Sequence, residues 1–229
     1  MKTTGGSDAA KRAAGERAAD AVQDGTTVGL GSGSTAAHAI RAIGRAVDAG
    51  LDVRGVPTSF AARQLAIEAG VPLAGLDEVD RIHLAIDGAD QVTPDGDCVK
   101  GGGAAHAREK VVDAFADRLL LVVDPSKEVD VLDHPVPVET LPDAWPTVTD
   151  RVEVLGGEAT LREGDRKDGP VVTDNGNLVL DCAFGAVEGP TRLAAELSAT
   201  PGVVEHGLFV GLADAVYVGR EDGVDVRTV

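Results

Sequence analysis

The chain has 229 residues and a formal net charge of −17, with 38 acidic side chains against 21 basic ones. Hydrophobic residues make up 43 %, enough for a folded core, and no apolar run reaches the ~18 residues that a membrane span needs. A chain this acidic repels nucleic-acid phosphates, and we therefore expect no nucleic acid as a partner. Without an apolar run of sufficient length, we expect no membrane as a partner either. The first residues lack the apolar stretch of a signal peptide, which predicts a cytoplasmic protein.

The lysine, aromatic and cysteine content indicates the ionic environment of the protein and bears on disulfide and metal sites. Only six basic residues are lysines and 3 % of the chain is aromatic, a balance typical of a high-salt cytoplasm in which ions screen self-repulsion. The two cysteines, Cys98 and Cys182, lie far apart and lack CxxC spacing. They predict neither a disulfide framework nor a metal site.

Hydrophobic periodicity in the first half of the chain alternates between helix and strand. Ser7 and Asp8 can cap a first helix. The predicted helices cover residues 9–22, from Thr35 onward, 60–69 and 104–116, and the predicted strands cover 26–30, 53–56, 82–86 and 119–123. This alternation predicts an α/β fold with a mostly parallel sheet and helices on both faces.

The pattern changes after about residue 130, where four prolines punctuate the chain. We expect a strand near 159–162, a hairpin of 171–173 with 178–180, and a helix over 191–199. These segments predict a small α+β unit inserted into the first domain. Residues 208–210 and 215–218 are expected to return to the main sheet.

Ligands of parallel sheets bind beyond the carboxyl ends of the strands, so polar residues there are candidates for a site. After the strand 26–30 come Gly31, Ser32, Gly33, Ser34 and Thr35, whose hydroxyls and helix N-terminus suit a phosphate. The segment matches neither a Walker loop nor a dinucleotide fingerprint, which disfavours a nucleotide cofactor. A tight strand–helix turn is the alternative interpretation.

Two further loops carry charged residues. Asp87-Gly88-Ala89-Asp90 follows the strand 82–86 and could exchange protons with sugar hydroxyls; a simple turn or a metal-binding pair are alternatives. Lys100-Gly101-Gly102-Gly103 precedes a helix in which Glu109 shares a face with the apolar Val112 and Ala116. A carboxylate desolvated by apolar neighbours suits a general base, although Glu109 could equally lie on the surface.

Lysines are scarce, which draws attention to those near the predicted site. Lys127, just after the strand 119–123, could reach an anion at the sheet edge or be an ordinary surface lysine. Lys11, on the first helix, has the same two interpretations. Arg108 and Lys110, beside Glu109, are expected to be solvated surface charges.

Taken together, these motifs resemble one known family. Their order along nearly the whole chain is similar to that of type A ribose-5-phosphate isomerases: VGLGSGSTAAH, IDGADQV, KGGGAAHAREK, DPSK, VPVETLP, VVTDNGN and PGVVEHGLF. The combination of DGAD with KGGGAAxxRE is the specific part of the match. The resemblance implies an enzyme that interconverts D-ribose 5-phosphate and D-ribulose 5-phosphate through an enediolate.

The resemblance also implies an architecture and an assembly. A Rossmann-like catalytic domain would comprise residues 1–131 and 208–229, and an inserted ferredoxin-like α+β lid would comprise residues 132–207. The family works without a metal or nucleotide cofactor, so none is expected here. A homodimer or homotetramer is implied.

By the same resemblance, Glu109 is the proton acceptor, and Asp87, Asp90 and Lys100 are further catalytic residues. The residues implied to bind the substrate are Lys11, Ser32, Gly33, Ser34, Thr35, Gly88, Ala89, Gly101, Gly102, Gly103 and Lys127. Two positions depart from the family pattern: Ser32 stands where threonine is frequent, and Gln91 stands where glutamate is usual. Neither change removes a residue with an implied role in catalysis.

Other functions are alternatives to this one. An amino-sugar deaminase or a coenzyme A transferase could use a similar fold, but neither accounts as well for KGGGAAxxRE. A non-catalytic sensor of sugar phosphates would carry a DNA-binding module. The first residues are too few and too acidic for a helix-turn-helix.

Overall fold

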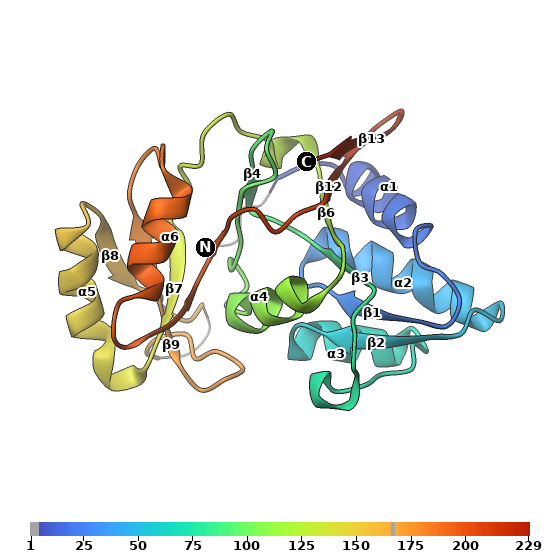
Figure 1. Cartoon of the computed structure of the whole chain (residues 1–229), viewed down its shortest axis with the longest axis horizontal. Coiled ribbons are helices and arrows are strands. Elements are labelled where there is room, and N and C mark those ends of the chain that lie inside the picture. Colours follow the sequence, from blue (N-terminus) through green and yellow to red (C-terminus); the bar gives the residue numbers. More distant parts are fainter. Residues whose placement is uncertain (1–4, 166–167) are drawn as a thin grey trace. The chain divides into compact units, whose positions relative to one another are not determined.

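The computed structural model describes residues 5–165 and 168–229, which divide into two compact units (Figure 1). The larger unit comprises residues 5–89, 108–128 and 212–229. The smaller unit comprises residues 90–107 and 129–211, a wider range than the 132–207 expected for the inserted part. Each unit is described by itself.

The larger unit is built on a six-stranded sheet with the strand order β13-β12-β6-β3-β1-β2. Five of its strands are parallel, and β13 runs antiparallel along β12. The bounds are β1 Thr26–Leu30, β2 Val53–Pro57, β3 Leu84–Asp87, β6 Leu119–Val123, β12 Ala215–Arg220 and β13 Gly223–Thr228. The predicted mostly parallel α/β sheet is confirmed. Its strands could be recognised in the sequence because a strand buried on both faces, such as β6, is a continuous apolar run.

Helices cover both faces of this sheet, as predicted. The bounds are α1 Asp8–Ala19, α2 Ser34–Asp48, α3 Phe60–Glu68 and α4 His106–Phe115, with short 3₁₀ turns at Leu76–Glu78 and Pro125–Lys127. Val28 and Leu30 of β1 pack in one core with Ile40 of α2 and with alanines of α1 and α3. Gly29, between them, faces α4, where a Cβ would lie 2.9 Å from Val112 Cγ1. Alternation along β1 thus separates the two helical layers.

The smaller unit contains a four-stranded antiparallel sheet with the order β10-β7-β9-β8. The elements follow one another as β7 Val136–Thr140, α5 Trp145–Val154, β8 Glu158–Leu161, β9 Leu178–Ala183, α6 Pro190–Ser198 and β10 Val203–His206, with a 3₁₀ turn at Pro142–Ala144. Val138, Leu180 and Cys182 of the sheet pack against Val148 and Leu197 of the helices. This β-α-β-β-α-β order confirms the ferredoxin-like expectation.

A third, three-stranded sheet has the order β11-β5-β4, with bounds β4 Gln91–Val92, β5 Cys98–Val99 and β11 Leu208–Phe209. The expectation that residues 208–210 join the main sheet is therefore wrong, since Leu208 and Phe209 pair with Val99 and Cys98. Residues 215–218 do join it, as part of β12. Because β12 already has β6 on one side and β13 on the other, it offers no edge to a further strand.

The predicted hairpin of 171–173 with 178–180 is also wrong in its first arm. The turn between the arms does form, with Gly176 N–H donating to the Thr173 carbonyl at 2.9 Å. However, residues 171–173 do not form a strand: their pairing with the second arm is an isolated bridge between Val172 and Leu178 and a bond of 2.9 Å from Thr173 N–H to the Asn177 carbonyl. β9 lies between β7 and β8, so most of its length has no edge left for a hairpin partner.

Candidate active site

The loop after β1 is held tightly against the end of β3. Ser32 N–H donates to Asp87 Oδ1 at 2.9 Å, and Gly31 N–H donates to the Ile86 carbonyl at 3.0 Å. A Cβ on Gly31 would overlap the Asp87 carboxyl group, so only glycine allows this close approach. The Ser32 hydroxyl lies 2.6 Å from Ser59 Oγ and 3.0 Å from Thr58 Oγ1. Hydroxyl groups from the ends of β1 and β2 therefore gather at one place.

The start of α2 has the features of an anion site. Gly33, its N-cap, has a φ of 98° and contributes no side-chain cap to the first N–H groups. Gly33 and Ser34 are exposed, whereas Thr35 is buried. The uncapped N–H groups and the positive end of the helix dipole favour a phosphate at this point.

Asp87 is the last residue of β3 and is fully buried. The strand therefore ends one residue later than predicted. Its Oδ1 accepts hydrogen bonds from Ser32 N–H and, at 2.7 Å, from Gly88 N–H. Gly88 and Ala89 continue the chain half-buried beyond the strand. Two backbone donors on one oxygen fix the orientation of this carboxylate at the carboxyl edge of the sheet.

Glu109 lies in the first turn of α4 and is 5 % exposed, so the structure selects the inward orientation of the two that the sequence leaves open. Val112, one turn later, packs into the core with Val56 and Ile82. Because β3 and β6 are parallel neighbours, α4 runs back between them and begins at the carboxyl edge. Glu109 and Asp87 thus belong to the same edge of the larger unit.

Arg108 does not behave as the predicted solvated charge. It is half-buried, and its Nε donates to the Pro57 carbonyl at 3.1 Å, where β2 ends beside Thr58. Lys110 is also half-buried rather than fully solvated. Periodicity alone could not reveal that the carboxyl end of β2 lies within reach of α4.

The two candidate lysines of the larger unit lie on elements that adjoin this edge. Lys127 is 7 % exposed, in the 3₁₀ turn that follows β6. Lys11 is half-buried on α1, one turn before Gly15. A Cβ on Gly15 would lie 2.7 Å from the Thr35 carbonyl, so this face of α1 packs on the start of α2. Neither residue is an ordinary solvated lysine.

The remaining candidates, Asp90 and Lys100–Gly103, belong to the smaller unit. Asp90 Oδ2 accepts a hydrogen bond of 2.8 Å from Gly102 N–H. Lys100 is 2 % exposed, and its Nζ lies 5.3 Å from the centre of the Phe209 ring, a cation–π distance. Gly101 has a φ of 100° and Gly103 is exposed. The predicted residues therefore form two groups, one in each unit.

Sequence reasoning missed an ion pair beside the glycine loop. Arg162 donates to both carboxylate oxygens of Asp181 and to the carbonyls of Gly101 and Gly102. Burial alone would raise the pKa of Asp181, but the hydrogen bonds and charge of Arg162 outweigh burial and hold that pKa below its ordinary value. No local motif marks either residue, since they are 19 positions apart, Arg162 just after the end of β8 and Asp181 on β9.

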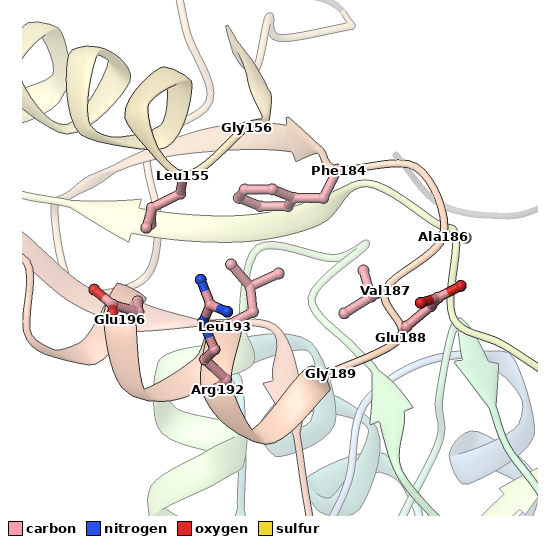
Figure 2. Close-up of a pocket in the computed structure, with 10 residues that line it drawn as sticks. All are labelled: Leu155, Gly156, Phe184, Ala186, Val187, Glu188, Gly189, Arg192, Leu193 and Glu196. Atoms are coloured by element: carbon pink, nitrogen blue, oxygen red, sulfur yellow. The ribbon is translucent and has the colours of Figure 1, made fainter.

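A surface pocket of about 240 Å³ in the smaller unit involves none of the predicted site residues. Leu155, Phe184, Val187 and Leu193 line it together with the charged Arg192 (Figure 2). Within residues 5–165 and 168–229, no three His, Cys, Asp or Glu side chains gather as metal ligands. Among the same residues, none of the helices is long and apolar enough to cross a membrane.

Comparisons with known proteins agree with one another. Residues 54–223 match the family model described as ribose 5-phosphate isomerase A (phosphoriboisomerase A). Ribose-5-phosphate isomerase A of Haloarcula marismortui is 68 % identical over 98 % of both chains, and that of Halobacterium salinarum is 64 % identical over 99 % of both. These two are halophilic homologues, in line with the salt adaptation that the composition predicts.

Solved structures give the same answer. Ribose 5-phosphate isomerase A from Methanocaldococcus jannaschii has a TM-score of 0.92 at 42 % identity, over 96 % of this chain and 98 % of that one. A D-ribose-5-phosphate isomerase in complex with phospho-erythronic acid has a TM-score of 0.93 at 41 % identity, over 96 % and 97 %. The chain belongs to the ribose 5-phosphate isomerase A family.

Proposed function

We propose that this chain interconverts D-ribose 5-phosphate and D-ribulose 5-phosphate through an enediolate. The observation that carries the proposal is the buried Glu109, set at the same sheet edge as Asp87 in a member of this family. A desolvated carboxylate suits a general base, and a second, hydrogen-bonded carboxylate at the same edge suits a proton relay to the sugar oxygens.

The substrate phosphate binds at the start of α2. The uncapped N–H groups of that helix, the Ser32 and Ser34 hydroxyls and Thr35 supply hydrogen-bond donors. Lys11 and Lys127 supply positive charge in a protein whose net charge is otherwise strongly negative. Fixing the phosphate there orients the rest of the sugar for reaction.

The reaction itself is a pair of proton transfers. Asp87 relays a proton as the sugar ring opens, and Glu109 then removes the C2 proton and returns it to C1. Lys100 and the N–H groups of Gly101–Gly103 stabilise the negative oxygen that develops between these steps, at about 3 kcal/mol for each well-placed donor. Asp90 holds or exchanges the hydroxyl protons. No metal or nucleotide takes part.

The structure solved with phospho-erythronic acid supports this scheme, because that molecule combines a phosphate with a carboxylate. Its two planar carboxylate oxygens resemble those of an enediolate, and an enzyme binds mimics of its intermediate tightly. We further propose that the chain works in the cytoplasm as a homodimer or homotetramer, which light scattering after size-exclusion chromatography would measure.

The deciding experiment is a coupled assay of Glu109→Gln with ribose 5-phosphate, in high salt and with a chelator present. Turnover should fall by at least about 100-fold while substrate binding stays near normal, because the amide cannot accept the proton. Glu68→Gln, an exposed glutamate on α3, is the matched control and should leave turnover unchanged. Turnover of Glu109→Gln above a few per cent of the parent would exclude Glu109 as the base.

A further inference from the structure

Arg162 makes contacts on two sides of its guanidinium group. Its side chain is 9 % exposed at the end of β8, and the partner Asp181 lies on the neighbouring β9, where Thr160 and Asp181 pair. Nε donates to Asp181 Oδ2 at 2.9 Å, and Nη2 donates to Oδ1. This fork-to-fork geometry fixes the plane of the guanidinium group on a strand pair.

The second side of Arg162 is directed at the glycine loop. Nη1 donates to the Gly101 carbonyl at 2.9 Å and lies 3.3 Å from the Gly102 carbonyl. The Gly101 carbonyl also accepts the Ala104 N–H at 2.9 Å, which closes the turn. A loop with a run of three glycines, inherently free to rotate, is therefore tied to a rigid sheet.

Because the peptide bond is planar, these contacts to carbonyls also fix the directions of the neighbouring N–H groups. In a trans peptide the N–H points opposite to the C=O, so a carbonyl bound to Arg162 sets the direction of the next N–H. The Gly101 carbonyl fixes the Gly102 N–H, which donates to Asp90 at 2.8 Å, and the Gly102 carbonyl fixes the Gly103 N–H. The positive charge of Arg162 also polarises the two peptide groups whose carbonyls it binds, and this strengthens their N–H groups as donors.

We infer that Arg162, held in place by Asp181, is a positioning residue for the isomerase reaction: it orients the Gly102 and Gly103 N–H groups and, through the first of them, Asp90. This inference rests on the proposed function, in which Asp90 and the glycine loop act on the sugar oxygens. Arg162 need not touch the substrate to do this. Its effect belongs to the step in which negative charge develops, because that is where oriented donors matter most.

The structure explains why arginine is needed at this position. The four hydrogen bonds come from three different nitrogens of one planar group, Nε, Nη1 and Nη2. Lysine keeps the charge but carries all its donors on one nitrogen, so it cannot span the carboxylate and both carbonyls. Arg162→Lys therefore separates positioning from simple charge.

The test measures kcat, KM and inhibition by phospho-erythronic acid for the parent, Arg162→Lys and Asp181→Asn. Arg162→Lys should lower kcat by about tenfold or more with little change in KM, and should weaken the inhibitor by a similar factor. Asp181→Asn should lose less, because the amide still accepts one bond from Arg162. The double variant should lose no more than Arg162→Lys alone, since the two residues act in series.

Arg151→Lys is the matched control, since Arg151 pairs with Glu196 at 2.6 Å on the surface of the same unit. It should leave all three constants unchanged. Hydrogen exchange provides a readout independent of activity: in Arg162→Lys the Gly102 amide should lose protection while amides of β7 and β9 keep theirs.

Three results would overturn the inference. Arg162→Lys could keep more than half of the parent kcat, or keep normal Gly102 protection, or lose activity only in proportion to its unfolded fraction at the assay temperature. A parent without isomerase activity would instead reject the proposed function, and the positioning role with it. An active parent beside an equally active Arg162→Lys rejects the positioning role alone.

Discussion

The backbone N–H of Ser32 donates to the Asp87 carboxylate at 2.9 Å and so ties the loop after β1 to the last residue of β3. The candidate phosphate loop and the candidate acid–base residue are therefore parts of one hydrogen-bonded unit. Substitution of Asp87 therefore tests the charge of this unit, whereas substitution of the neighbouring Gly31 tests the position of the two strand ends.

Asp87→Asn removes the charge while keeping an oxygen that can accept from Ser32 and Gly88. We expect kcat to fall about 100-fold or more, because the amide cannot relay a proton, with the melting temperature within a few degrees of the parent. A coupled assay and thermal unfolding measure the two effects. Asp214→Asn is the control, since Asp214 accepts the Leu119 N–H at the opposite end of β6. A kcat close to the parent value would remove Asp87 from the mechanism.

Gly31→Ala tests position instead of charge. The added Cβ would overlap the Asp87 carboxyl group, so one of the two strand ends must shift. We expect the free energy of unfolding in urea to fall by about 1–3 kcal/mol and most turnover to disappear. Gly189→Ala makes the same chemical change at the N-cap of α6, where nothing lies within 4 Å of the new methyl group; it should cost at most about 1 kcal/mol and leave turnover intact. Equal behaviour of the two variants would show that the close approach is unimportant.

The Arg162–Asp181 pair predicts a dependence of stability on pH. The pKa of Asp181 lies below its ordinary value of 3.8 in the folded protein, despite burial, because of Arg162. The pair therefore contributes fully above about pH 4, and its contribution is lost as pH falls through the lower folded pKa. Urea unfolding should show the parent and Asp181→Asn converging in stability below pH 4. A difference that stayed constant down to pH 2 would contradict this sign.

Cys182 should be chemically inert in the folded protein. Burial, and secondly the charge of Asp181, raise the pKa of its thiol to about 12, and the side chain is fully buried. Since the thiolate is the reactive form, iodoacetamide at about pH 8 should leave Cys182 unlabelled in the native protein and label it in urea. Peptide mass spectrometry reads both states. Rapid native labelling would mean that β9 opens readily.

The net charge of −17 predicts stabilisation by salt. Raising KCl from about 0.1 M to about 2 M should raise the melting temperature, because added ions screen repulsion among the acidic side chains. A neutral osmolyte at matched osmolality is the control and should have a smaller effect. A melting temperature that did not respond to KCl would count against adaptation to salt.

The sequence was most informative where one strand end carries its own chemistry. Gly31–Thr35 and Asp87 could be placed beside each other because parallel strands end at a common edge. For Glu109, the apolar Val112 and Ala116 on its helix face indicate an inward orientation but leave the surface alternative open. These are local patterns combined with a single topological rule.

What escaped prediction depends on pairing between distant segments. The local pattern places Arg108 on the surface, yet from α4 its Nε donates to the Pro57 carbonyl at the end of β2. The local pattern also places residues 208–210 in the main sheet, although Leu208 and Phe209 pair with β5. Arg162 and Asp181 gave no signal because each is unremarkable until β8 and β9 lie side by side. Register between strands is set by the whole fold, which a short window of sequence does not contain.

The position of β12 has a consequence for the order in which the larger unit can fold. β12 is an interior strand, and α1 packs so closely on it that a Cβ on Gly219 would overlap the Ala10 carbonyl. Helix α1 can therefore pack fully only once β12, a segment far away in sequence, has joined the sheet. Until then β6 is an open edge, the kind of surface that pairs readily with other chains. Closing this gap between distant segments is expected to be a slow step in folding of the larger unit.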